Sequence, residues 1–107
     1  YESNDANSLW EGDNINITPW GDLIICEDNG SNACKLVDCT PNGTLYPLGR
    51  VAGNSSSEIA GICFSPDGQN MYLNIQDEGK TIVVSGDWTK IREFRDSLDS
   101  NKVHYEV

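Results

Sequence analysis

Short apolar runs alternate with turn residues along most of the chain, which predicts β-strands rather than long helices. Ile15 and Ile17 alternate with polar residues, as in a half-buried strand. Residues 23–26 are continuously apolar, as in a strand that is covered on both faces. Further strands are expected over 35–40, 44–48, 58–65, 70–75 and 81–85. The pattern therefore predicts an all-β fold in which four short antiparallel strands are followed by three.

Two strand–turn–strand units share one sequence pattern. Residues 18–21 (Thr-Pro-Trp-Gly) in the first unit correspond to residues 65–68 (Ser-Pro-Asp-Gly) in the second. In both turns proline presets φ and glycine supplies a positive φ at low cost. The two units lie 47 positions apart, from Glu11 to Glu58, and we interpret the second turn as followed by a two-residue insertion. A repeat with a period of roughly 40–50 residues is typical of the blades of a β-propeller.

This repeat defines the domain organisation. We interpret residues 1–107 as one partial propeller unit with about two antiparallel blades, the first over 9–52 and the second over 57–87, followed by a helix and a tail over 88–107. Asp87 is a candidate N-cap, and Ile91, Phe94 and Leu98 share one face of the expected amphipathic helix. The alternation over 102–107 favours an edge strand, which completes the second blade or pairs with another chain.

Charge and composition narrow the possible partners. The chain has 107 residues and a formal net charge of -10, which argues against nucleic acid or an anionic membrane as a partner. No apolar run approaches the roughly 18 residues that span a bilayer. The acidic balance fits either a cation site or a solvated surface. Because the chain begins at Tyr1 rather than Met, we expect either processing or a piece of a longer product.

Four cysteines, an even number, suit two disulfides: Cys26, Cys34, Cys39 and Cys63. If residues 23–27 and 34–40 form adjacent antiparallel strands, Cys26 lies nearly opposite Cys34. Cys34 and Cys39 would be about 16 Å apart on an extended strand, beyond the roughly 7 Å that a disulfide allows. We therefore favour Cys26–Cys34, with Cys39–Cys63 joining the blades. The alternative leaves Cys26 free beside Glu27.

Four glycosylation sequons accompany the cysteines, at Asn16, Asn29, Asn42 and Asn54. Three of them fall in expected loops, whereas Asn16 falls in an expected strand. Together the cysteines and the sequons favour a secreted, extracellular glycoprotein. The alternative is a bacterial chain in which the sequons arise by chance.

Blade geometry predicts where polar groups converge. If the first strand of each unit leaves one mouth of the propeller and the second returns to it, the start of the first and the end of the second meet there. The residues concerned are Glu11, Asp13, Asn14, Glu27 and Asp28 in the first unit and Glu58, Asn74, Gln76 and Asp77 in the second. Carboxylate and amide oxygens are the ligands that calcium prefers. The alternative is that these groups cap strand ends in water. The single histidine, His104, lies in the tail, which argues against a zinc site.

Two stretches resemble the C-terminal part of the PhoX-type alkaline phosphatases: residues 14–29, NINITPWGDLIICEDN, and residues 57–76, SEIAGICFSPDGQNMYLNIQ. The similarity runs from about Trp10 to Trp88. Members of that family are secreted β-propellers that hydrolyse phosphomonoesters with calcium and iron, held by carboxylates and a cysteine. The resemblance implies that Glu27 and Glu58 are metal ligands, with Asp13 as a weaker correspondence. Asn29 stands where the family usually has glycine, and the family's full propeller needs several more blades.

Three functional hypotheses remain open at this point. The first is a segment of a PhoX-like secreted, metal-dependent phosphomonoesterase, with the missing propeller portion supplied elsewhere. The second is a secreted, glycosylated structural subunit that assembles with copies of itself into a polymer or filament through its open blades. The third is a binding module that has kept the blades and lost the chemistry. Phosphatase activity with bound-metal analysis separates the first from the others, and solution mass separates the second from the third.

Overall fold

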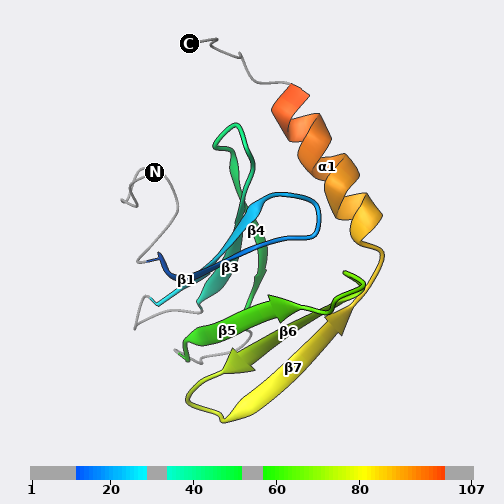
Figure 1. Cartoon of the computed structure of the whole chain (residues 1–107). Helices are drawn as coiled ribbons and strands as arrows, with labels where there is room; N and C mark the ends of the chain where they lie inside the picture. Colours follow the sequence, from blue (N-terminus) through cyan, green and yellow to red (C-terminus); the bar gives the residue numbers. More distant parts are fainter. Residues whose placement is uncertain (1–11, 29–33, 52–56, 101–107) are drawn as a thin grey trace.

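The structure is a computed structural model, and it describes residues 12–28, 34–51 and 57–100. Two antiparallel sheets are followed by one helix (Figure 1). The first sheet holds β1 (Gly12–Ile17), β2 (Leu23–Glu27), β3 (Lys35–Cys39) and β4 (Leu45–Arg50), and the second holds β5 (Ile59–Phe64), β6 (Asn70–Ile75) and β7 (Lys80–Ser85). The helix is α1 (Trp88–Ser100). The prediction of an all-β fold with four strands and then three, and a short helix after them, is confirmed. The tail strand expected over 102–107 lies outside the described residues.

Both hairpins close with turns of the predicted kind. The amide of Gly21 donates to the carbonyl of Thr18 at 3.0 Å, and that of Gly68 donates to Ser65 at 2.8 Å. Both glycines have positive φ, 88° and 73°, which a residue with a side chain adopts only at a cost. The expected two-residue insertion is wrong, however, because the strand pairing makes the second connection only one residue longer. Ile17 pairs with Leu23, and Phe64 pairs with Met71.

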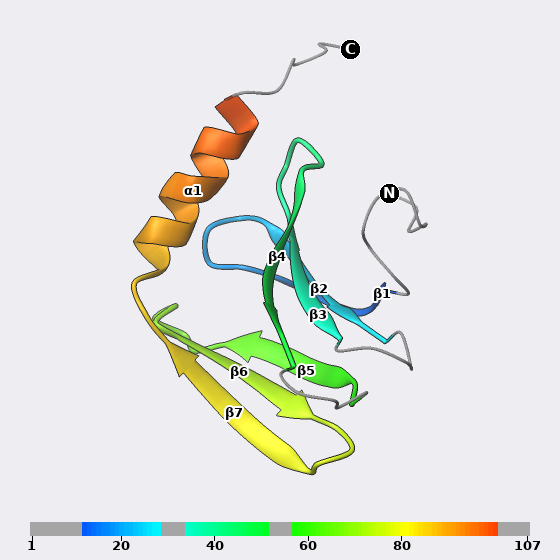
Figure 2. The ribbon, with the colours of Figure 1, turned by 180° about the vertical axis from the view of Figure 1, so that it is seen from behind.

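One shared apolar layer joins the two sheets. Ile24 and Cys26 of β2 are fully buried against the second sheet, where Leu73 and Ile75 of β6 are 6% and 5% exposed. β1 and β2 both contact β5, so the sheets meet at these inner strands, while β4 and β7 form the outer edges (Figure 2). On the far face of the first sheet, Ile25 belongs to a second, smaller apolar cluster. The prediction that residues 23–26 form a strand covered on both faces therefore holds for Ile24, Ile25 and Cys26.

Aromatic rings attach the start of α1 to both sheets. Asp87 accepts a hydrogen bond from the amide of Thr89 at 3.1 Å and so acts as the expected N-cap. The ring of Trp88 stacks on Trp20, with centroids 5.5 Å apart, and meets the edge of Phe64 at 6.2 Å. Trp20 lies in the β1–β2 connection and Phe64 ends β5, so this contact joins all three parts of the molecule.

The inward face of α1 differs from the predicted one. Ile91 and Leu98 are half-buried as expected, but Phe94 is 52% exposed, and its ring meets that of Tyr46 edge-on with the centroids 5.3 Å apart. The side chain of Arg95 is only 13% exposed and donates to the carbonyl of Trp20 at 3.3 Å. The helix therefore turns a charged group toward the first sheet where the sequence pattern favoured an aromatic one.

A bulge in β5 makes Gly61 a sensitive position. The register shifts between Ala60 and Cys63, and Gly61 has a φ of 62°. A Cβ atom on this glycine would lie 2.8 Å from Nδ2 of Asn74. The side chain of Asn74 is itself held by Thr81, whose hydroxyl donates to Oδ1 at 2.7 Å.

We therefore expect Gly61→Ala to lower the free energy of unfolding by about 1–2 kcal/mol or more, because left-handed backbone strain and a steric clash add together. Gly49→Ala is the matched control, since Gly49 also lies in a strand but has ordinary φ and nothing within 4 Å of the added Cβ. Urea unfolding of both variants measures the difference. Equal stabilities would show that the bulge tolerates a side chain.

Candidate metal centre

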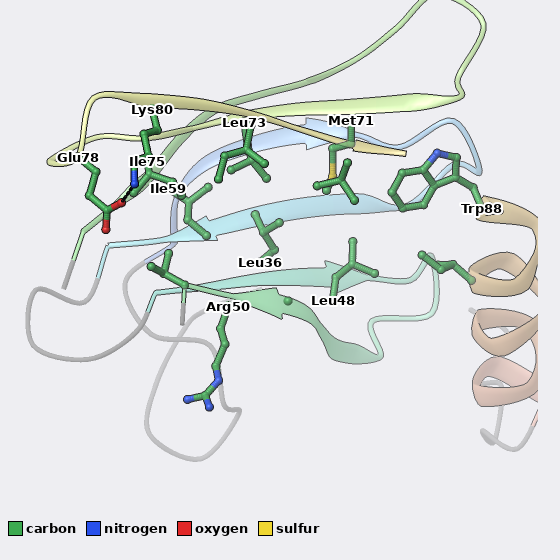
Figure 3. A pocket seen from close by; sticks show the side chains of 15 residues that line it. Leu36, Leu48, Arg50, Ile59, Met71, Leu73, Ile75, Glu78, Lys80 and Trp88 are labelled. Carbon is green, nitrogen blue, oxygen red and sulfur yellow. Dashed lines mark ion pairs between the residues drawn. The ribbon is translucent and has the colours of Figure 1, made fainter. Parts of the chain in front are cut away.

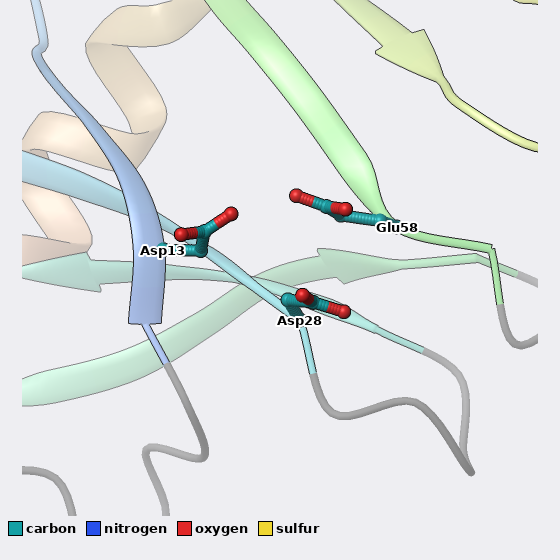
Figure 4. A group of neighbouring side chains, drawn as sticks. All are labelled: Asp13, Asp28 and Glu58. Carbon is teal, nitrogen blue, oxygen red and sulfur yellow. The ribbon is translucent and has the colours of Figure 1, made fainter.

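Three carboxylates from the two sheets converge on one point. Asp13 lies in β1, Asp28 follows β2 directly, and Glu58 precedes β5 directly. One oxygen atom of each lies within 4.8 Å of the other two. Figure 4 shows the three side chains directed toward the space between the strands. The structure thus brings together Asp13 and Glu58, two of the residues that the resemblance implied as ligands.

Local backbone irregularities direct these side chains. The β1–β2 register shifts between Gly12 and Asn14, so Asp13 is an extra residue in its strand, and a bulge of this kind re-aims a side chain. Glu58 is fixed through its backbone, since its carbonyl accepts a hydrogen bond from the amide of Gln76 at 3.0 Å. The preceding residue, Ser57, accepts a bond from the amide of Asp77 at 2.9 Å.

Negative charge crowds this point. The pKa of Glu58 is raised, first by a hydrogen bond with Asp13, then by burial and by the charges of Asp28, Asp13 and Asp77. The pKa of the Cys26 thiol is raised to about 11, mainly by burial and then by the charges of Glu58 and Asp13. The negative charges of Glu58 and Asp13 therefore act on this thiol as well as on one another. A bound cation would offset the mutual repulsion of these groups.

The donor set fits a divalent cation. Three carboxylates are hard oxygen ligands of the type that calcium takes, and Asp13 is exposed enough for ions to enter. Asp13, Asp28 and Glu58 are thus the residues that could hold a divalent cation.

Glu27, the third ligand implied by the resemblance, has a different environment. Its side chain is fully buried, with Oε1 3.4 Å from Nζ of Lys35 and Oε2 accepting a bond from the amide of Lys35 at 3.2 Å. The adjacent Asp28 takes the third place in the cluster. The sequence offered a signal for Asp28, because it ends a strand that returns to the predicted mouth. Glu11, the other acid expected at this mouth in the first unit, lies outside the described residues.

The cysteines occupy three different environments, and none of the four forms a disulfide in the structure. Cys26 and Cys34 are both fully buried between the sheets, but Cys26 pairs with Leu36, so Cys34 is offset by two residues rather than opposite. Cys39 belongs to the cluster on the far face of the first sheet. Cys63 is exposed beside Tyr72 on the far face of the second sheet. The structure therefore does not bring Cys39 and Cys63 together, because their side chains lie on opposite outer faces.

The sequons also differ. Asn42 is exposed in the β3–β4 connection. Asn16 is half-buried in β1, and its amide nitrogen donates to the carbonyl of Ile62 at 2.7 Å, so attachment of a glycan there would break a contact between the sheets. Asn29 and Asn54 lie outside the described residues.

A separate apolar cleft of about 580 Å³ opens between the outer strands of the two sheets. Figure 3 shows Leu36 and Leu48 on one side, Leu73 on the other, and Trp88 at one end. An ion pair between Glu78 and Lys80, 3.1 Å long, lies at the other end. None of the three clustered carboxylates lines this cleft, so it is not part of the candidate metal centre.

Comparison of the sequence with models of known protein families gave a match. A family model described as alkaline phosphatase PhoX matches residues 1–79. The chain belongs to the PhoX alkaline phosphatase family. The PhoX match includes both hairpin turns, all three clustered carboxylates and Cys26, and it ends before α1.

Two other comparisons gave no match. A search of the curated proteins and a search of the solved structures each found no significant match to this chain. Among the described residues, no helix combines the length and the apolar character needed to cross a membrane.

The buried Glu27–Lys35 pair yields a stability prediction. Lys35→Met should lower the free energy of unfolding by about 1–3 kcal/mol, because it leaves a buried carboxylate without its cation. Lys80→Met is the control, since the Glu78–Lys80 pair is exposed at 40% and 66% and should change stability by less than about 0.5 kcal/mol. Denaturant unfolding of both variants is the measurement. If Lys35→Met cost no more than Lys80→Met, Glu27 would not depend on its ion pair.

Proposed function

We propose that this chain is the metal-binding segment of a secreted PhoX-type phosphomonoesterase, and that further propeller blades complete its active site. The observation that carries the proposal is the convergence of Asp13, Asp28 and Glu58 from strand ends of two different sheets. Strand ends capped by water have no need to direct three carboxylates at one another. Family membership independently supports a phosphatase-related role.

The chemistry of the site explains why a metal is part of the proposal. A phosphomonoester is an anion, and the side chains directed at this point are acids, which would repel it. A divalent cation held by Asp13, Asp28 and Glu58 would offset most of their negative charge and would supply Lewis-acid stabilisation of the phosphoryl oxygens. The protein's own contribution is to hold the three carboxylates in place, through the bulge at Asp13 and the fixed backbone of Glu58.

We test the metal site first in the isolated chain. Asp28→Asn and Glu58→Gln remove one charge each while nearly preserving shape, so each should weaken calcium binding by about tenfold or more. Titration calorimetry measures the affinity, and Glu78→Gln serves as control because Glu78 is an acid of the β6–β7 turn outside the cluster. Glu27→Gln should leave calcium affinity close to that of the unmodified chain, since Glu27 pairs with Lys35.

Activity is the second part of the same test. In the complete assembly, hydrolysis of a phosphomonoester should require the metal and should fall with the same two variants. If Asp28→Asn and Glu58→Gln change neither metal content nor hydrolysis, the phosphatase assignment is wrong.

A second candidate function is a secreted, glycosylated structural subunit that polymerises through its open faces. Ile15, Ile17 and Leu23 are 63%, 67% and 41% exposed on the outer face of the first sheet. Leu23 pairs with Ile17 as Met71 pairs with Phe64, so Leu23 and Met71 hold equivalent places. Met71 is buried against the first sheet. The outer face of the first sheet therefore carries Leu23 at the position where the second sheet carries its packing residue, Met71. Another blade could pack on this outer face in the same way.

This arrangement predicts head-to-tail stacking of copies. Ile17→Asp blocks the outer face of the first sheet, and Val83→Asp blocks that of the second, where Val83 is 53% exposed. Each variant alone should stay monomeric, because one of the two faces that form the contact is blocked in every copy. A mixture of the two variants should form dimers, because each variant keeps the face that the other has lost. Light scattering with size-exclusion chromatography measures the masses. A chain that is monomeric at all concentrations would rule this function out.

A further inference from the structure

A pair of buried acids lies outside the candidate metal centre. Asp22 in the β1–β2 connection is 1% exposed, and Asp38 in β3 is completely buried. Their carboxyl groups lie within hydrogen-bonding reach of each other. Since an ionised carboxylate only accepts hydrogen bonds, a bond between two of them requires that one carries a proton.

Few hydrogen-bond donors lie close to the two carboxyl groups. The indole Nε1 of Trp20 donates to Oδ2 of Asp38 at 3.1 Å, and Arg95 of α1 lies with NH1 3.5 Å from Oδ1 of Asp22. Within the described part of the chain, both oxygens of Asp22, Oδ1 of Asp38 and the hydroxyl of Tyr46 are buried without a hydrogen-bond partner. Buried polar atoms are normally paired, so these four atoms need an explanation.

A single proton explains them. With both acids ionised, two negative charges would face one guanidinium in a buried place, where unpaired charge is costly. With one proton on the pair, the negative charge that remains is balanced by Arg95, and an otherwise unpaired oxygen gains a donor. A metal ion is the poorer explanation, because the indole N–H and the guanidinium already present positive groups to these oxygens.

We propose that Asp22 and Asp38 share one proton, which ties the β1–β2 connection to β3. The titratable groups that face the pair are Tyr46 from β4 and Arg95 from α1, and Nε of Arg95 also lies 3.0 Å from Oδ1 of the exposed Asp96. Tyr46 stays protonated, because burial and the charge of Asp38 raise its pKa. Arg95 keeps its charge at all pH values of interest.

The direction of the pKa of Asp38 supports this. Burial, followed by the interaction with Asp22, raises the pKa of Asp38 from 3.8 to about 7, although the hydrogen bond from Trp20 lowers it. The folded state therefore holds this proton more tightly than the unfolded chain does. The stability that it contributes is fully present below pH 3.8 and is lost as the pH rises through about 7.

Equilibrium unfolding of the full chain between pH 5 and pH 8 tests the proposal. Asp38→Asn is the informative variant, because asparagine keeps the shape and offers a permanent donor to Asp22. Between pH 5 and pH 7 the folding equilibrium constant of the unmodified chain should fall by up to about tenfold per pH unit relative to this variant. Asp67→Asn, at an exposed turn acid, should keep the slope of the unmodified chain. If the unmodified chain and Asp38→Asn show the same slope, the proposal is overturned.

A direct measurement decides the matter even if Asp38→Asn does not fold. Infrared spectroscopy detects the carbonyl band of a protonated carboxylic acid, and we would record it in a Glu58→Gln chain so that Glu58 cannot contribute. The band should be present at pH 6 and should shrink between pH 6 and pH 8. Absence of the band at pH 6 would overturn the proposal.

Discussion

The apolar layer between the two sheets is the interaction on which the rest of this structure depends. Ile24 and Cys26 of the first sheet and Leu73 and Ile75 of the second lose nearly all contact with water there. Each of the three aliphatic side chains contributes roughly 1.5–3 kcal/mol when it is fully buried. Because the sheets meet at β1, β2 and β5, the same packing brings the ends of these strands to one place. The carboxylate cluster is therefore a consequence of hydrophobic packing, which offsets the repulsion among the three acids.

The helix adds a second layer of dependence. Trp20 packs against both Phe64 and Trp88, and its indole nitrogen also donates to Asp38. Arg95 then reaches from α1 to the carbonyl of Trp20 and to Asp22. One aromatic side chain thus takes part in the contact between the sheets, the attachment of the helix and the buried acid pair. A substitution that disturbs any one of these three contacts should therefore also weaken the other two.

Local pattern was enough to predict most of the backbone. The strand over 70–75 was predicted with its observed bounds, since alternation and turn residues act within a few positions. Which of two adjacent residues takes a given role was not predictable, because tertiary contacts determine it. Glu27 and Asp28 are both acids at a strand end, and only the pairing of Glu27 with Lys35 and the bulge at Asp13 separate their roles. Phe94 and Arg95 likewise both fit a helical period, and the buried Asp22 decides which one turns inward.

Two blades assemble the acidic cluster but do not enclose it. Asp13 remains exposed and Asp28 and Glu58 are only half-buried, so water has access to every carboxylate. Water weakens the field of a bound cation, whereas a site that excludes water strengthens each electrostatic contact with a phosphoryl group. The outer faces that remain open, at Leu23 and at Val83, are the surfaces on which further blades would pack. Under the proposed function, blades packed on the open faces at Leu23 and Val83 would therefore complete the shielding that the carboxylate cluster lacks in two blades.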